Sequence, residues 1–272
     1  VSLNPPGSVF KVVVTAAALA SGRFTADSVL PGPKTYQLPN STKKLRNWTG
    51  TECGPGGKVT LRQALAISCN TAFAWLGNEL GAAAIRDQAE SFGFNTGFEI
   101  PLRAATSLFP ESPDAPQTAL SSIGQFDVRA TALQMAMVAA SVGNSGRTMN
   151  PYLVQEIRGP DLSILQTTEP GQFADALKPS NSLSLTEMMV NVVENGTGSN
   201  AKIPGVRVAG KTGTAQTGND SPSVAWFISF APAAAPKVAV AVVIEESGAA
   251  EVSGNGLAAP IAKAVMEAVL GR

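Results

Sequence analysis

Pro6-Gly7-Ser8-Val9-Phe10-Lys11 leads directly into an apolar run over residues 12–20, and this run ends at Ser21-Gly22. The run is rich in helix-forming residues, and Pro6-Gly7 cannot continue a helix backwards, so we expect a buried helix that begins near Ser8. Residues three positions apart lie on the same face of a helix, with Cβ atoms about 5–6 Å apart. The spacing therefore predicts that the amine of Lys11 can reach the hydroxyl of Ser8.

A serine hydroxyl is a weak nucleophile until a base takes its proton, and a lysine that is desolvated or close to another cation can be that base. The chain contains no histidine. This absence excludes Ser-His-Asp and Cys-His catalysis and the histidine-based zinc sites, so a nucleophilic serine here must use lysine. A serine three residues before a lysine is expected about once by chance in such a chain. A second pair, Ser41 and Lys44, lies in a polar segment that we interpret as a solvated loop.

The composition describes a globular protein with a sizeable core. The chain has 272 residues, of which 44% are hydrophobic and 15% charged, and its formal net charge is zero. This balance argues against nucleic acid as a partner. No apolar run approaches the roughly 18 residues of a membrane span, and no signal peptide is present. Because catalytic serines rarely lie so close to a natural N-terminus, we expect further sequence upstream.

The two cysteines are Cys53 and Cys69. Two thiolates are too few for a four-ligand zinc site, and no metal site or cofactor is predicted. The cysteines are either buried free thiols or a disulfide that closes a short loop. We favour the disulfide, which is typical of an oxidising, extracytoplasmic compartment.

The pattern of apolar residues predicts an α+β protein with two lobes. Predicted helices follow the N-terminal one at residues 61–80, with an interruption at 68–70, and at 82–92, 128–142, 184–194 and 256–270. Thr60 with Gln63 and Ser184 with Glu187 are the predicted helix-capping pairs. Residues 23–58 and 93–125 are predicted to be mainly loops, with a short strand near 35–38. A hairpin is expected at 152–157 and 163–166, and an antiparallel meander at 206–216, 224–231 and 237–245. We expect a helical lobe over roughly 8–150 and a sheet lobe over roughly 151–272.

Three short motifs follow one another along the chain: Ser8-x-x-Lys11, Ser68-x-Asn70 and Lys211-Thr212-Gly213-Thr214. Each has an ordinary interpretation, because serine and asparagine favour helix caps and a Lys-Thr-Gly run can end a strand. A second Ser-x-Asn occurs at Ser253. The three motifs in this order, each in a fitting structural context, indicate a single site rather than coincidence.

The residue types of these motifs fit acyl transfer. Ser68 can relay a proton, and Asn70 can donate a hydrogen bond to a substrate amide. Lys211 adds a positive charge that would help to keep Lys11 neutral and would attract a carboxylate. These roles require Ser68 and Asn70 to face one cleft, with Cys69 directed to the scaffold behind.

The other residues of the third motif are expected to bind the substrate. Thr212 and Thr214 offer hydroxyl groups to a substrate carboxylate, and Gly213 would let the substrate approach the strand backbone closely. The backbone N–H groups of Ser8 and Thr214 are candidates for an oxyanion hole. The loss of one such donor typically costs about 2.7–4 kcal/mol of barrier.

This set of motifs resembles that of the serine β-lactamase and penicillin-binding superfamily. The likeness is greatest to the transpeptidase domain of class B penicillin-binding proteins, in detail to the penicillin-binding protein A type, and it spans nearly the whole chain. Further stretches that carry it are Gly124-Gln125, Leu133-Gln134-Met135-Ala136, Ala225-Trp226-Phe227, Phe230-Ala231-Pro232 and Ala258-Ala259-Pro260. The family often has glycine where Phe126 stands and histidine where Val224 stands.

The resemblance implies a five-stranded-type antiparallel sheet flanked by helices, an all-helical lobe, and an active site in the cleft between them. It implies a membrane anchor and a non-catalytic domain upstream, which would place the enzyme on the extracytoplasmic face of a bacterial membrane.

The implied function is that of a peptidoglycan D,D-transpeptidase. Ser8 would attack the D-Ala-D-Ala carbonyl of a stem peptide, an amine of a neighbouring stem peptide would resolve the acyl-enzyme, and β-lactam antibiotics would acylate Ser8. Expected partners are cell-wall or divisome proteins, in cell division or the control of cell shape. The alternatives are a D,D-carboxypeptidase, a serine β-lactamase and a β-lactam sensor domain that does not catalyse turnover. Against the β-lactamase, neither Glu99 nor Glu111 opens the Glu-x-x-Leu-Asn segment of the class A enzymes.

Overall fold

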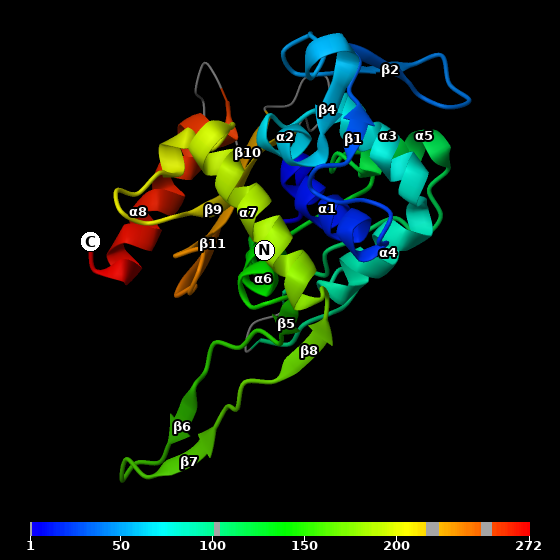
Figure 1. The fold of residues 1–272 in the computed structure, drawn as a ribbon. Helices are drawn as coiled ribbons and strands as arrows, with labels where there is room; N and C mark the ends of the chain where they lie inside the picture. Colours follow the sequence, from blue (N-terminus) through cyan, green and yellow to red (C-terminus); the bar gives the residue numbers. More distant parts are fainter. Residues whose placement is uncertain (1, 101–103, 216–222, 246–251) are drawn as a thin grey trace.

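The computed structural model describes residues 2–100, 104–215, 223–245 and 252–272. It confirms the α+β class, with an antiparallel sheet and helices on both of its sides (Figure 1). The sheet consists of β9 (Ala209–Ala215), β10 (Val224–Ala231) and β11 (Val238–Ile244) in the order β11-β10-β9. The predicted meander is therefore confirmed.

The sheet has three strands in the described part of the chain, where a five-stranded type was expected. The reason is that the other strands are only three or four residues long and pair with one another in two-stranded ribbons. These ribbons join β1 (Val29–Pro31) to β4 (Lys58–Thr60), β2 (Thr35–Gln37) to β3 (Lys44–Arg46), β5 (Arg147–Met149) to β8 (Gln172–Asp175), and β6 (Glu156–Arg158) to β7 (Ile164–Thr167). The β6–β7 ribbon is the predicted hairpin, and it extends away from the body of the molecule (Figure 1).

The central strand β10 is buried along its whole length because apolar residues alternate onto both faces of the sheet. Trp226, Ile228 and Phe230 belong to the main core, and Phe227 belongs to a second core on the other face. Figure 1 shows α8 beside the sheet, on the side away from α1. Burial on both faces fixes the register of the meander, since a slip by one residue would exchange the two sets of side chains.

The helices are α1 (Lys11–Ala20), α2 (Leu61–Ala66), α3 (Asn70–Leu80), α4 (Ala82–Ser91), α5 (Ala115–Ser121), α6 (Ala132–Gly143), α7 (Pro179–Asn195) and α8 (Ala259–Leu270). Short helical turns are η1 (Gly7–Phe10), η2 (Pro55–Gly57), η3 (Ser199–Ala201) and η4 (Gly254–Ala258). The start of the first helix near Ser8 is confirmed, and so is the interruption at 68–70 that separates α2 from α3. No helix in the described ranges is long and apolar enough to span a membrane.

One segment predicted to be mainly loops contains a helix, and two predicted helix starts were wrong. Residues 93–125 contain α5, which starts with a capping box between Asp114 and Gln117 and tolerates Pro116 in its first turn. The helix predicted from Ser184 begins earlier, at Pro179, so the apparent capping pair lies inside α7. The helix predicted from residue 128 begins only at Ala132. Thr131 caps it, because its Oγ1 accepts a hydrogen bond from the backbone N–H of Gln134.

Candidate active site

The turn that carries Ser8 is fixed between β9 and the loop at Gly124. The Gly7 N–H donates to the Gly124 carbonyl oxygen over 2.9 Å. Gly124 has φ +72°, and a Cβ atom there would overlap the Gly7 carbonyl group. A Cβ atom on Gly7 would lie 3.0 Å from the Thr214 carbonyl oxygen. These glycines are therefore required for η1 to approach the strand, and they place half-buried Ser8 beside the end of β9.

The amine of Lys11 makes three hydrogen bonds to the second motif. Its Nζ donates to the Ser68 carbonyl oxygen over 2.8 Å, to Ser68 Oγ over 3.2 Å and to Asn70 Oδ1 over 2.7 Å. The Lys11 side chain is completely buried. The first two motifs therefore meet as the sequence predicts.

The amine of Lys211 reaches the same serine from the sheet. Its Nζ donates to Ser68 Oγ over 3.0 Å and to the Thr212 carbonyl oxygen over 2.8 Å, and its side chain is also completely buried. Ser68 Oγ thus lies between two amines that come from opposite sides, one from α1 and one from β9. All three motifs converge on this oxygen.

The hydroxyl of Ser8 is not among the partners of Lys11 in the described part of the structure. The three polar contacts of Lys11 Nζ go instead to Ser68 and Asn70. The direct Ser8–Lys11 hydrogen bond expected from the spacing is therefore absent from this state, although the two residues follow one another across the junction of η1 and α1. A role of Lys11 as the base toward Ser8 remains a proposal.

Ser68 lies in a strained turn between α2 and α3. Its φ is +59°, a conformation that costs a residue other than glycine about 1–2 kcal/mol. The Cys69 N–H donates to the Ala64 carbonyl oxygen over 2.9 Å, and Cys69 forms a disulfide with Cys53. Both cysteines are buried behind the turn. The disulfide, which the sequence favoured, therefore anchors the backbone directly after the strained residue.

The amide of Asn70 is held at both ends. Its Oδ1 accepts from Lys11, and its Nδ2 donates to the Arg46 carbonyl oxygen over 3.2 Å. These two bonds fix the orientation of the amide. The Nδ2 group has two hydrogens, so one donor remains for the substrate contact that we predict.

Burial makes both amines weakly basic. It lowers the pKa of Lys211 from 10.5 to about 7. The pKa of Lys11 lies well below its ordinary value, first because the side chain is buried and second because Lys211 is a nearby positive charge. A neutral amine that can accept a proton is therefore available near neutral pH, in a chain that has no histidine.

The third motif divides between the two faces of β9. Thr212 Oγ1 lies 2.6 Å from Thr197 Oγ1, so the predicted carboxylate ligand already has a hydroxyl partner. Thr197 follows α7, and its N–H donates to the Ala66 carbonyl oxygen over 3.0 Å, which joins the end of α2 to β9. Thr197 was not predicted as a site residue, because a Gly-Thr-Gly run after a helix carries no chemical signal of its own.

Gly213 has a packing role that the sequence did not reveal. A Cβ atom at this position would lie 3.0 Å from the Pro6 carbonyl oxygen and 3.0 Å from Val9 Cγ1. The approaching group is therefore the chain's own η1. The expected approach of a substrate to this backbone stays a prediction, as does the oxyanion hole formed by the N–H groups of Ser8 and Thr214.

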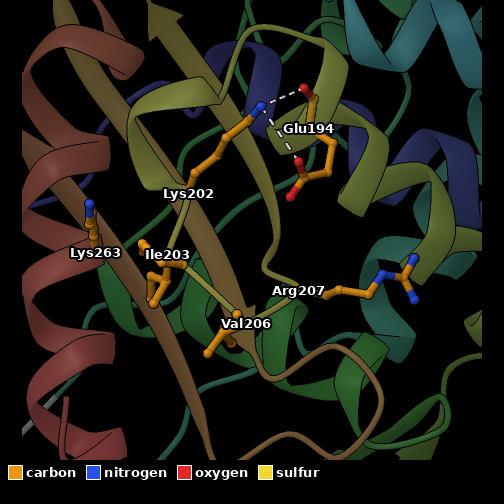
Figure 2. A pocket seen from close by; sticks show the side chains of 8 residues that line it. Glu194, Lys202, Ile203, Val206, Arg207 and Lys263 are labelled. Carbon is orange, nitrogen blue, oxygen red and sulfur yellow. Dashed lines mark hydrogen bonds and ion pairs between the residues drawn. The ribbon is translucent and has the colours of Figure 1, made fainter.

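A surface pocket of about 640 Å³ lies away from these groups, beside η3 and α8 (Figure 2). Its basic side chains are each paired with a carboxylate: Lys202 with Glu194 over 3.5 Å, Arg207 with Glu187 over 2.6 Å, and Lys263 with Glu267 over 3.9 Å. Figure 2 shows Lys202 turned toward Glu194 and Arg207 pointing away from both. Since these charges are balanced and none of the three motifs lines the pocket, we assign it no part in the chemistry.

Comparisons with known proteins agree with this geometry. The family model of the penicillin binding protein transpeptidase domain matches residues 2–267. The chain is 46% identical to peptidoglycan D,D-transpeptidase PbpA of Mycolicibacterium smegmatis and 47% identical to the protein of that name from Mycobacterium tuberculosis. Each match covers 98% of this chain and 55% of the relative. The chain thus spans about half the length of these curated relatives.

Solved structures match over the same region. Penicillin-binding protein A of M. tuberculosis as a ceftriaxone acyl-enzyme complex superposes with a TM-score of 0.94, and its penicillin G acyl-enzyme complex with 0.92. Both are 46% identical to this chain, and each match covers 98% of this chain and 61% of the solved one.

Proposed function

The chain belongs to the penicillin-binding protein transpeptidase domain family, and from this premise we propose that it is the catalytic domain of a peptidoglycan D,D-transpeptidase. The family resemblance predicted from the motifs is confirmed. One observation supports a specific mechanism: Ser68 Oγ lies 3.2 Å from Lys11 Nζ and 3.0 Å from Lys211 Nζ. This convergence supplies a connected path for protons in a site without histidine.

In the proposed acylation step, Ser8 Oγ attacks the carbonyl carbon between the two terminal D-Ala residues of a stem peptide. Neutral Lys11 accepts the hydroxyl proton as the new C–O bond forms. The tetrahedral intermediate collapses, the C–N bond breaks, and the leaving D-Ala amine takes a proton passed back through Ser68. The products are free D-Ala and an ester on Ser8, with the lysines in their starting protonation states.

In the second step, an amine of a neighbouring stem peptide attacks the ester carbonyl carbon. The amine loses its proton to the same Lys11–Ser68 pair, and the proton returns to Ser8 Oγ as the ester C–O bond breaks. A β-lactam follows the first step, but its leaving amine stays attached to the acyl group. The acyl-enzyme complexes of the M. tuberculosis protein are consistent with this proposal.

We further propose that the hydroxyls of Thr212 and Thr214 bind the terminal carboxylate of the donor peptide, close to the charge of Lys211. The hydrogen bond between the Thr197 and Thr212 hydroxyls supports this role because it fixes the position of the Thr212 hydroxyl. The Ser8 and Thr214 N–H groups would bind the developing oxyanion. An oxyanion-hole donor must be placed before the reaction, and the glycine contacts between η1 and β9 are of the kind that fixes such a position.

We propose a division into a helical lobe over 8–150 and a sheet lobe over 151–272. Helix α7 contacts both α2 and β9.

We also propose an extracytoplasmic location on the bacterial membrane, which the Cys53–Cys69 disulfide supports. Cell-wall or divisome proteins are proposed as partners.

The test is the intact mass of the protein after incubation with benzylpenicillin, for the wild type and for Ser8→Ala, followed over hours. We expect a stable adduct of one penicilloyl group in the wild type and none in the variant. An adduct that clears within seconds would instead indicate a β-lactamase. The transfer of a labelled stem peptide to an added amine would distinguish a transpeptidase from a carboxypeptidase, which transfers it to water, and from a sensor, which does not turn it over. No adduct on a folded wild-type chain would refute the role of Ser8.

A further inference from the structure

The β2–β3 ribbon presents two basic side chains to solvent on one face. The antiparallel register pairs Gln37 with Lys44 and Thr35 with Arg46, so Lys44 and Arg46, two residues apart on β3, project to the same side. Both are exposed. The side chains of Tyr36 and Leu45 project to the other side and pack on a small core between α3 and α5. The ribbon therefore has one packed face and one free, basic face.

The ribbon is attached directly to the catalytic groups. The Arg46 carbonyl oxygen accepts from Asn70 Nδ2 over 3.2 Å, and Asn70 in turn accepts from Lys11. The next residue, Asn47, is buried and accepts from the Thr71 N–H over 3.0 Å. Two consecutive residues of this segment thus bond to the start of α3. Both strands of the ribbon contact α3, the helix that begins at Asn70, and β2 lies near α3 in Figure 1. We infer from these contacts that the basic face borders the site.

The positive charge of this segment is not neutralised locally. Residues 28–59 contain five basic residues and one acidic residue, in a chain of zero net charge. The basic residues are Lys34, Lys43, Lys44, Arg46 and Lys58. None of them takes part in an ion pair within the described ranges. Such a segment attracts acidic ligands at a distance and raises their rate of association.

An exposed tryptophan adjoins these charges. Trp48, two residues after Arg46, is 77% exposed, whereas Trp226 is completely buried. A large aromatic ring that gains no stability from burial in its own protein offers contact area to a ligand. Together, Lys44, Arg46 and Trp48 form a surface, which we call the basic rim, that can bind charged groups and cover part of an extended molecule.

We propose that the basic rim binds the side-chain carboxylates of peptidoglycan stem peptides. It would thereby favour stem peptides with a free side-chain carboxylate as substrates. The inference rests on the proposed transpeptidase function and adds a substrate preference to it. The carboxylates would pair with Lys44 and Arg46 at the surface, while the reacting carbonyl lies at Ser8. Exposed pairs are individually weak, so two of them together are expected to change kcat/KM by about 3- to 10-fold.

The test compares Lys44→Gln/Arg46→Gln with a matched control, Lys178→Gln/Lys237→Gln, which removes the same charge from exposed positions elsewhere. Transpeptidation is measured with a stem peptide that has a free side-chain carboxylate and with its amidated analogue, at low and at high salt. Benzylpenicillin acylation is measured in parallel, because this small molecule tests the catalytic groups alone.

We expect the rim variant to lose about 3- to 10-fold in kcat/KM for the carboxylate peptide only, with the loss shrinking at high salt. Its penicillin acylation and the activity of the control variant should equal those of the wild type. No loss in the rim variant, an equal loss with the amidated peptide, or an equal loss in the control would overturn the basic rim while leaving the transpeptidase intact. Failure of the wild type to be acylated would instead refute the proposed function.

Discussion

Replacement of Lys211 by glutamine tests whether the second lysine controls the first. Both amines bond to Ser68 Oγ, over 3.2 and 3.0 Å, so their nitrogens are at most about 6 Å apart. Two unit charges at that distance repel by about 2.8 kcal/mol at an effective dielectric constant of about 20. The positive charge of Lys211 should therefore lower the pKa of Lys11 in addition to the effect of burial.

The expected result is a shift of the acidic limb of the pH–rate profile. In the proposed mechanism, acylation of Ser8 requires neutral Lys11, so the rate constant should fall as the pH drops through the pKa of Lys11. In Lys211→Gln the repulsion is absent and that pKa rises, while the larger effect of burial remains. The midpoint of the limb should therefore move to higher pH.

The assay is the rate constant of benzylpenicillin acylation between pH 5 and 10, measured by quenched intact-protein mass. Lys202→Gln is the control, because it removes the same charge from an exposed position outside the site. A midpoint that stays in place or moves to lower pH, in a variant with the wild-type circular dichroism spectrum, would refute the proposed coupling of the two lysines.

If Lys211→Gln is inactive, the pH dependence of its free energy of unfolding still tests the lowered pKa of Lys211. The folded pKa of Lys211 is about 7 and its ordinary value is 10.5, so between these pH values the unfolded chain binds one proton more than the folded chain. Stability therefore rises with pH across this window, by about 1.4 kcal/mol per pH unit for this one group, and the contribution is constant above it. Lys211→Gln should lose that slope in urea unfolding, and an unchanged slope would contradict the lowered pKa.

Three further results are expected. Cys53→Ser should lower the free energy of unfolding by about 3 kcal/mol, because the disulfide closes a loop with a sequence separation of 16, and urea titration with and without reductant measures this. Gly124→Ala should abolish acylation, because its Cβ would overlap the Gly7 carbonyl group; in the control Gly22→Ala, which also has positive φ but has open space around it, we expect only the conformational cost of about 1–2 kcal/mol. Asn70→Asp should slow acylation at neutral pH at least tenfold, because a carboxylate 2.7 Å from Lys11 would favour the ammonium form, and the rate should recover at alkaline pH.

The sequence was sufficient to predict that the three motifs meet, because the pattern of each motif is local. Absence of histidine left lysine as the base, and the helical pattern after Lys11 and the strand pattern after Lys211 placed both amines on buried elements. The break at Ser68 was visible because a serine, a cysteine and an asparagine interrupt an apolar helical run. These predictions required no distances.

The sequence was insufficient where a contact joins residues that are distant along the chain. The positive φ of Ser68 and the bond between Thr197 and Thr212 depend on how α2, α7 and β9 meet. Helix α5 was missed because Pro113 and Pro116 are typical of loops, although proline also fits the first turn of a helix. The packing of η1 against Gly213 could not be predicted, because a sequence cannot show which element occupies that side of the strand.

The two lysines of the site have no carboxylate partner in the described part of the chain, and this favours their neutral forms. An amine with an ordinary pKa is protonated at neutral pH and cannot act as a base. In the described part of the chain, no ion pair includes Lys11 or Lys211, and their hydrogen bonds go to hydroxyl, amide and carbonyl oxygens. A carboxylate partner would stabilise the charged form and raise the pKa. Burial of two amines without a counter-charge therefore costs stability in the charged state, and the same cost favours the neutral amine that the proposed mechanism requires of Lys11.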